Sequence, residues 1–129
     1  MKLGKIVQSI SQNIGSAADI EITGIAYDSR AVKPGYLFVA IRGFETDGHK
    51  YIKSAVRNGA AAVIGELDAE CDCPYIKCED SRRAMALAAA EFYGHPERRL
   101  KIIGITGTNG KTTTTYLIKQ ILNLKGERC

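Results

Sequence analysis

Residues 104–113 read GITGTNGKTT, and they lie between a short apolar run and a longer segment with an apolar stripe. The glycines at 107 and 110 permit backbone angles that turn several successive N–H groups into one concavity, which suits phosphate oxygens. Lys111 adds a mobile positive charge, and a helix beginning there would direct its positive end to the same place. A strand, a glycine loop and a helix in this order are typical of the start of an α/β nucleotide-binding domain.

This loop departs from the strict phosphate-loop pattern G-x-x-x-x-G-K-[ST]. That pattern requires a glycine where this chain has Ile105, whereas Gly107 lies three positions before Gly110. The charge of Lys111 and the hydroxyl of Thr112, which can bind Mg²⁺, are both retained. The alternative is a glycine turn that caps a helix and exposes a lysine without function.

C-terminal to the loop, the sequence predicts a helix over residues 111–125. Its broad apolar stripe consists of Leu117, Ile118, Ile121, Leu122 and Leu124, and Gly126 ends it. Since the sequence stops three residues later, we expect an incomplete ATP-binding domain and no ligase activity from the 129 residues alone. An uncovered stripe would also favour self-association through this helix.

N-terminal to the loop, the polar segment 94–100 (GHPERRL) predicts a domain boundary, dividing the chain into residues 1–97 and 98–129. The predicted fold class is α/β: a small mixed α/β substrate-binding domain, then the first strand, phosphate loop and helix of the truncated ATP-binding domain. Apolar periodicity predicts helices over residues 3–12, after an Asp47 cap and after a Ser81 cap, and strands over residues 20–26, 36–41, 61–65, 75–77 and 102–105.

Two polar segments each follow a predicted strand of the first domain, residues 28–30 (DSR) and 43–49 (GFETDGH). Loops at strand ends in a small α/β domain can converge on one ligand. Ser29 offers a neutral hydrogen bond, and Arg30 can pair with a phosphate. A turn with a salt bridge and a helix cap explain the same residues. His49, for which the sequence identifies no carboxylate partner, is then a structural histidine.

Composition excludes several other classes of protein. The chain is 45% hydrophobic and has a net charge of +4, with no tryptophan and no low-complexity tract, so nothing favours a nucleic-acid partner. The absence of an apolar run of about 20 residues and of a signal sequence predicts a cytoplasmic protein with no membrane partner. The spacing of Cys71, Cys73 and Cys78 does not favour a zinc site.

Taken together, five segments resemble the Mur ligases, and they extend over nearly the whole chain. They are residues 28–30, 34–40 (PGYLFVA), 47–49 (DGH), 92–96 (FYGHP) and 104–115 (GITGTNGKTTTT). The loop is most similar to the branch of that family that adds the third amino acid to UDP-MurNAc-L-Ala-D-Glu in peptidoglycan synthesis. The branch that adds a dipeptide has a similar front domain. A nucleotide-binding module without catalysis is a further alternative.

The resemblance implies an ATP- and Mg²⁺-dependent ligase whose small-molecule substrates are a UDP-MurNAc-peptide and an amino acid. A carboxylate of the peptide is phosphorylated, and the incoming amine attacks the acyl phosphate. Tyr27 and Ser29 are expected to contact the uridine end of the UDP substrate, and the same pocket is expected to be lined by Phe44, Glu45 and Thr46. Arg30 is expected to bind a phosphate of this substrate because of its charge. The ATP phosphates are expected against Gly107, Thr108, Asn109, Gly110, Lys111, Thr112 and Thr113, with Lys111 as the catalytic residue and Thr112 as the metal ligand.

Overall fold

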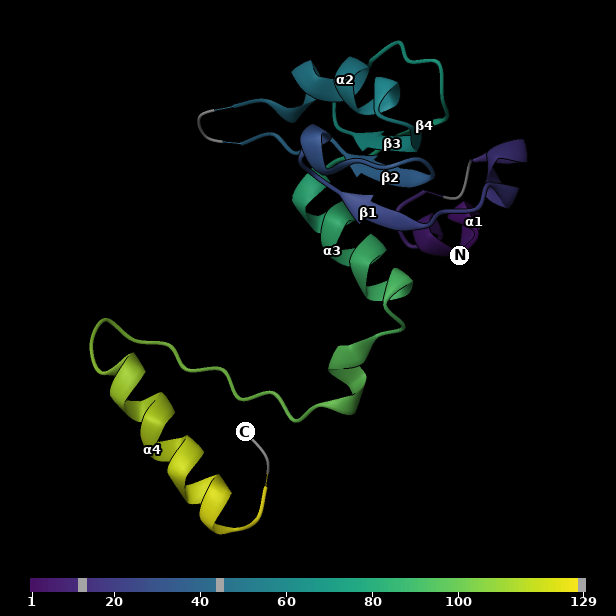
Figure 1. Ribbon diagram of the computed structural model, residues 1–129. Coiled ribbons are helices and arrows are strands. Elements are labelled where there is room, and N and C mark those ends of the chain that lie inside the picture. Colours follow the sequence, from purple (N-terminus) through teal and green to yellow (C-terminus); the bar gives the residue numbers. More distant parts are fainter. Residues whose placement is uncertain (12–13, 44–45, 128–129) are drawn as a thin grey trace. The chain divides into compact units, whose positions relative to one another are not determined.

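The computed structural model describes residues 1–11, 14–43 and 46–127, and the chain divides into two compact units, Met1–Pro96 and Glu97–Cys129 (Figure 1). The first unit contains a four-stranded sheet with helices on both faces. The second contains one long helix preceded by extended chain. Among the described residues, no helix has the length and apolar character that a membrane span requires.

The sheet of the first unit is entirely parallel, with strand order β1-β2-β3-β4. The strands are β1 (Gly24–Ala26), β2 (Tyr36–Val39), β3 (Ala60–Gly65) and β4 (Tyr75–Lys77), which confirms a strand within each range predicted for this unit. β1 is shorter than predicted, because Glu21 forms an isolated antiparallel bridge with Lys2 instead of joining the sheet. In a parallel sheet all strands end at one edge, so the segments that follow β1, β2, β3 and β4 meet there.

Two helices cover one face of the sheet and one covers the other (Figure 1). α1 (Leu3–Val7) and α3 (Ser81–Phe92) pack on one face, and α2 (Ile52–Arg57) packs on the opposite face. Adjacent strand residues therefore point into different cores: Leu37 and Val39 lie with α1 and α3, whereas Phe38 lies with α2. Short 3₁₀ helices occupy Gly15–Asp19, Ser29–Ala31 and Gly48–Tyr51.

Two predicted helix boundaries in this unit are wrong. α1 ends at Val7 rather than near residue 12, because the N–H of Ile10 bonds the Val7 carbonyl three residues back, which tightens the turn. The cap of α3 is Asp80, whose Oδ1 accepts from the N–H groups of Arg82 and Arg83, at 2.9 and 3.0 Å. Ser81 is instead the first helical residue, and its hydroxyl donates to Glu66. Asp47 is a cap as predicted, but it caps the 3₁₀ helix Gly48–Tyr51, and α2 begins only after that turn.

In the second unit, α4 (Lys111–Leu124) confirms the predicted helix, and Gly126 follows it in a left-handed conformation, with φ of 81°. The predicted strand over residues 102–105 is wrong: the segment is extended but forms no ladder. A strand requires a hydrogen-bonding neighbour, and the described part of this unit, residues 97–127, contains no other strand. A 3₁₀ helix, Pro96–Arg99, comes before the extended chain.

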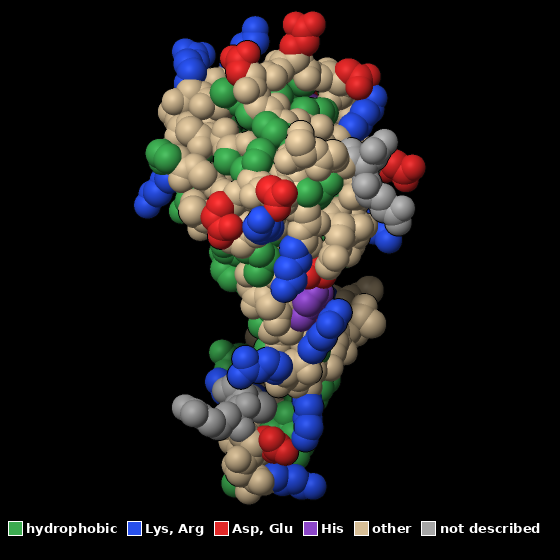
Figure 2. Space-filling model, turned by 90° about the vertical axis from the view of Figure 1, so that its right-hand side faces the viewer, with side chains coloured by type: hydrophobic (Ala, Val, Ile, Leu, Met, Phe, Trp, Pro, Cys, Tyr) green, Lys and Arg blue, Asp and Glu red, His purple; other side chains and the backbone are tan. Residues whose placement is uncertain are grey.

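Apolar side chains of the second unit are exposed. They include Ile102, Ile103, Tyr116, Leu117, Ile121 and Leu124, the last of which is 89% exposed. Figure 2 shows apolar side chains, in green, at the surface among basic ones. The predicted stripe of α4 therefore exists as an uncovered surface of this unit, and self-association through it stays a prediction.

Candidate functional site

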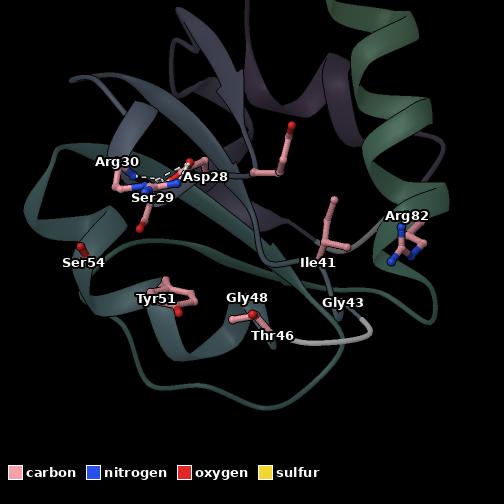
Figure 3. Close-up of a pocket in the computed structure, with 11 residues that line it drawn as sticks. Asp28, Ser29, Arg30, Ile41, Gly43, Thr46, Gly48, Tyr51, Ser54 and Arg82 are labelled. Carbon is pink, nitrogen blue, oxygen red and sulfur yellow. Dashed lines mark hydrogen bonds and ion pairs between the residues drawn. The ribbon is translucent and has the colours of Figure 1, made fainter.

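A hollow at the edge of the sheet where the strands end brings the two predicted loops of the first unit together (Figure 3). Its cavity volume is about 700 Å³. The loop after β1 and the loop after β2 both line it, as expected for neighbouring parallel strands. The described lining residues are Tyr27, Asp28, Ser29, Arg30, Ile41, Gly43, Thr46, Gly48, Tyr51, Ser54 and Arg82.

On one side of this cavity, Asp28 and Arg30 form a close ion pair. Arg30 Nη2 lies 2.7 Å from Asp28 Oδ2, and Nε lies 3.0 Å from Oδ1. The backbone N–H of Arg30 also donates to Oδ1, at 2.9 Å. Hydrogen bonds from the Arg30 side chain and backbone lower the pKa of Asp28 to about 2. The structure therefore contains the turn and salt bridge that the sequence analysis gave as a structural explanation of these residues. The Asp28 carboxylate compensates the charge of Arg30.

Between these two charged residues, Ser29 borders the cavity but is largely buried. Ser29 is only 7% exposed, and its carbonyl accepts a hydrogen bond of 2.8 Å from the side-chain amide of Asn58. Asn58 ends α2, so this contact ties the loop after β1 to the helix on the opposite side of the cavity. The backbone of Ser29 is therefore fixed where its side chain borders the cavity.

The loop after β2 is a tight reversal. The N–H of Gly43 donates to the carbonyl of Thr46 at 3.0 Å, and Arg42 forms an antiparallel bridge with Asp47. A Cβ on Gly43 would lie 2.7 Å from that same carbonyl oxygen, so the reversal requires glycine. Thr46 lines the cavity. The predicted residues Phe44 and Glu45 lie outside the described residues.

His49 connects this loop to the loop after β3. Its Nδ1 lies 2.6 Å from Asp47 Oδ1, and its Nε2 accepts from the N–H groups of Glu66 and Leu67 at 2.9 and 3.2 Å. Both ring nitrogens are thereby used, and the side chain is 8% exposed. His49 is a structural histidine, as the sequence indicated, although it does have the carboxylate partner that the sequence did not identify.

A buried serine continues this connection to α3. Ser81 is fully buried, and its N–H and hydroxyl both donate to Glu66 Oε1, at 2.9 and 2.7 Å. These bonds hold the pKa of Glu66 below its usual value. The Ser81 oxygen in turn accepts a longer bond of 3.4 Å from the N–H of Arg42. Hydrogen bonds thus join the segments after β2, β3 and β4 beneath the cavity.

In the second unit, the glycine loop has the backbone that its sequence predicts. Gly107 and Gly110 have φ of 150° and 75°, and Gly110 stands at the N-cap of α4 without a side-chain cap. The first N–H groups of this fourteen-residue helix are therefore not capped by the side chain of the N-cap residue. The Lys111 ammonium folds back over the loop and donates to the carbonyls of Gly107 and Thr108.

Sequence comparison covers both units. Residues 21–93 match the family described as "Mur ligase family, catalytic domain", and residues 105–129 match the "Mur ligase middle domain". The first match alone extends over more than half of the 129 residues. The chain belongs to the Mur ligase family.

Relatives among the Mur ligases are similar along nearly the full chain. The UDP-N-acetylmuramoyl-L-alanyl-D-glutamate–2,6-diaminopimelate ligase of Listeria monocytogenes is 49% identical over 129 residues, which cover 99% of this chain and 26% of that protein. The UDP-N-acetylmuramyl-tripeptide synthetase of Roseiflexus sp. is 54% identical over 109 residues, covering 82% of this chain and 21% of that protein. The chain spans about a quarter of the length of these relatives.

Solved Mur ligase structures share the fold. A UDP-N-acetylmuramoyl-L-alanyl-D-glutamate–2,6-diaminopimelate ligase matches all of this chain and 27% of its own, with a TM-score of 0.74 and 28% identity. The MurF ligase of Thermotoga maritima, solved in complex with ADP, matches 82% of this chain and 24% of its own, with a TM-score of 0.60 and 32% identity.

Of the substrate residues predicted for this Mur ligase chain, the structure brings four to one cavity: Tyr27, Ser29, Arg30 and Thr46. The predicted phosphate-loop residues, 107–113, lie together in the other unit. The sequence did not identify three polar side chains of the cavity, Tyr51, Ser54 and Arg82. The first two follow the 43–49 segment at helical spacing, which is a usable signal. No such local signal marks Arg82, because it lies in α3, which follows β3 and β4 in the sequence.

Proposed function

We propose that the first unit binds the uridine end of a UDP-MurNAc-peptide and that the loop of the second unit binds the phosphates of ATP. In this proposal, the chain supplies both sites to an ATP-dependent ligase that joins an amino acid to UDP-MurNAc-L-Ala-D-Glu. The Listeria relative carries that substrate in its name, and the MurF ligase of Thermotoga maritima was solved with ADP.

The observation that carries the proposal is the convergence of Ser29 and Thr46 on one cavity from two separate loops. Both belong to segments in which the resemblance expects uridine contacts. The cavity combines aromatic surface from Tyr27 and Tyr51 with hydroxyl groups and charged groups. A nucleoside, which has a flat base with polar edges and a polar sugar, matches such a lining.

The phosphate loop fits ATP for a separate reason. Two glycines with positive φ place the chain so that the uncapped N-terminus of α4 can face an anion. The ammonium of Lys111 bonds two loop carbonyls, and it can exchange these for the oxygens of a γ-phosphate. The exposed hydroxyl of Thr112 would hold Mg²⁺, which would neutralise charge on the transferred phosphoryl group.

Calorimetric titration tests both halves of the proposal on the 129-residue chain. UDP-MurNAc-L-Ala-D-Glu and Mg-ATP are titrated separately into the wild type, Ser29→Ala and Ser9→Ala. Ser9 is an exposed serine distant in sequence from both sites and serves as the matched control. We expect Ser29→Ala to weaken the UDP compound about tenfold, since a lost hydrogen bond costs about 1.4 kcal/mol, and to leave Mg-ATP unchanged.

Each alternative gives a different result. If Mg-ATP binds and the UDP compound does not, the chain is a nucleotide-binding module without a UDP-sugar site. If UDP-MurNAc-tripeptide binds in preference to UDP-MurNAc-L-Ala-D-Glu, the MurF branch, which adds a dipeptide to its substrate, is the better assignment. That branch is supported by the Thermotoga structure, which nevertheless matches less of the chain than the diaminopimelate ligase structure does.

A further inference from the structure

A pair of thiols lies in the loop that joins β3 to β4, on the same side of the sheet as α2 (Figure 1). Cys71 and Cys73 are both half-buried, and both pack against the core cluster that contains Phe38 and Ile52. Their Sγ atoms are 3.9 Å apart, with the Cys73 thiol directed at the Cys71 sulfur. The Cys71 thiol in turn donates to the Cys73 carbonyl at 3.1 Å. The fold thus holds two reduced sulfur atoms side by side.

This separation is compatible with the formation of a disulfide. An S–S bond measures about 2.05 Å, so the two sulfur atoms must approach each other by about 2 Å. Rotation of the two side chains about their Cα–Cβ bonds can supply part of this movement. Residues 66–74 lie outside the helices and strands, so the backbone of the loop can supply the rest without breaking a regular element.

A third thiol provides a natural comparison. Cys78 is also half-buried, but it follows β4 and packs against the other core cluster, which contains residues of α1 and α3. Its Sγ donates to the Gly65 carbonyl at 3.4 Å. The sheet therefore separates Cys78 from the pair, and Cys78 serves as a matched control for any reaction that depends on the proximity of two thiols.

The two thiols of the pair differ in their access to small molecules. Cys71 lines a hollow of about 710 Å³ beside α2, in which it lies with Lys53, Arg57 and Asp72. Cys73 is not among the described residues that line this hollow. Burial and the neighbouring Cys71 raise the pKa of Cys73 to about 12, so its thiolate is scarce near neutral pH. A reagent that enters the hollow therefore meets Cys71 first.

We propose that Cys71 and Cys73 are a reversible modification site, which closes to an intramolecular disulfide by exchange with a small-molecule disulfide such as glutathione disulfide. In the first step, the Cys71 thiolate attacks one sulfur of the reagent, whose S–S bond breaks and releases one thiolate. In the second step, Cys73 attacks the Cys71 sulfur of the mixed disulfide, and the second small thiolate leaves and takes up the Cys73 proton. The protein loses two electrons and two protons overall, and the reagent is reduced to two thiols.

The disulfide would constrain a loop that supports the cavity of the first unit. The N–H groups of Glu66 and Leu67, which bond to His49 Nε2, belong to this loop. The Leu67 carbonyl also accepts from the hydroxyl of Tyr75, which follows the loop in β4. The inference does not depend on what binds in the cavity, because it rests on the two sulfur atoms alone.

Incubation of the full 129-residue chain with glutathione disulfide tests this assignment, with alkylation in guanidinium, trypsin digestion and mass spectrometry as the readout. Cleavage after Arg57 and Lys77 leaves Cys71 and Cys73 in one peptide and Cys78 in the next, so an internal disulfide differs from a cross-link between peptides. We expect the peptide of residues 58–77 to lose two hydrogen atoms without gaining a partner, and dithiothreitol to restore it. Cys78→Ser should behave like the wild type.

Two further variants test the order of attack. Cys73→Ser should stop the reaction at a mixed disulfide on Cys71, whereas Cys71→Ser should leave Cys73 unmodified. At equilibrium with glutathione, the folded chain should favour the internal disulfide about tenfold more than the urea-unfolded chain does, because the fold already holds the sulfur atoms together. The same equilibrium in both states, a cross-link to Cys78, or no mixed disulfide in Cys73→Ser would overturn the assignment. A wild type that does not react with glutathione disulfide would overturn it as well.

Discussion

His49 Nδ1 lies 2.6 Å from Asp47 Oδ1, the same oxygen that accepts the backbone N–H of His49 at 3.0 Å. One carboxylate oxygen thus caps a 3₁₀ turn and orients the imidazole of the second residue of that turn. With Nδ1 directed to Asp47, Nε2 is left to accept the N–H groups of Glu66 and Leu67. The side chain therefore holds the loops after β2 and β3 together, and the cavity lies against the first of them.

Replacing His49 with alanine should destabilise the first unit. The change leaves two backbone N–H groups without their acceptor, and we expect the free energy of unfolding to fall by about 1–3 kcal/mol. Urea denaturation at pH 7.5 measures this. Lys50→Ala, an exposed neighbour on the same turn, is the control and should change stability by less than about 0.5 kcal/mol. Equal effects of the two substitutions would show that His49 does not join the loops.

The Asp28–Arg30 pair predicts an unusual acid titration. Hydrogen bonds from Arg30 lower the pKa of Asp28 to about 2, against an ordinary value of 3.8. The stabilisation is therefore fully present above pH 3.8 and is lost as the pH falls through about 2. Carboxyl NMR of the folded chain should give a midpoint near 2 for Asp28. The same carbon in urea-unfolded protein should titrate near the ordinary value, and a folded midpoint near 3.8 would mean that the pair does not form in solution.

The convergence of the two cavity loops was predictable because it depends on local patterns. Short apolar runs indicated the strands, and in a parallel sheet consecutive strands must end at the same edge. Segments 28–30 and 43–49 follow two such strands, so their meeting required no knowledge of distant contacts. The Asp47 cap was equally local, since a carboxylate beside a helix start is a property of a few adjacent residues.

Other features depend on contacts that no local pattern contains. Ser81 resembles a helix cap in sequence, but burial directs its hydroxyl to Glu66, fifteen residues away, and Asp80 becomes the cap. Residues 102–105 have the composition of a strand, yet a strand forms only beside another strand. Arg82 reaches the cavity only because α3 begins at the edge where β2 ends, which is a consequence of the complete sheet.

The thiol of Cys73 should react slowly. Burial and the neighbouring Cys71 raise its pKa to about 12, so at pH 8 roughly one molecule in ten thousand has the reactive thiolate. Mass-spectrometric mapping of iodoacetamide labelling should show Cys73 almost unmodified in the folded chain at pH 8, with a rate that rises with pH beyond 9. The guanidinium-unfolded chain is the control and should label as an ordinary cysteine. Rapid labelling of folded Cys73 at pH 8 would contradict the burial.

The two glycines at either end of the phosphate loop should respond differently to alanine. Gly110 has φ of 75°, which disfavours a side chain by about 1–2 kcal/mol, although nothing lies within 4 Å of the added Cβ. Gly104 has the same open surroundings without the left-handed φ, so Gly104→Ala is a matched control. We expect Gly110→Ala to weaken Mg-ATP binding about tenfold and to speed amide hydrogen exchange at the start of α4, whereas Gly104→Ala should change neither. Since both substitutions add the same methyl group to open space, only the backbone conformation distinguishes them. Equal affinities for Mg-ATP would therefore mean that the left-handed turn at Gly110 is not what presents the helix N-terminus to the phosphates.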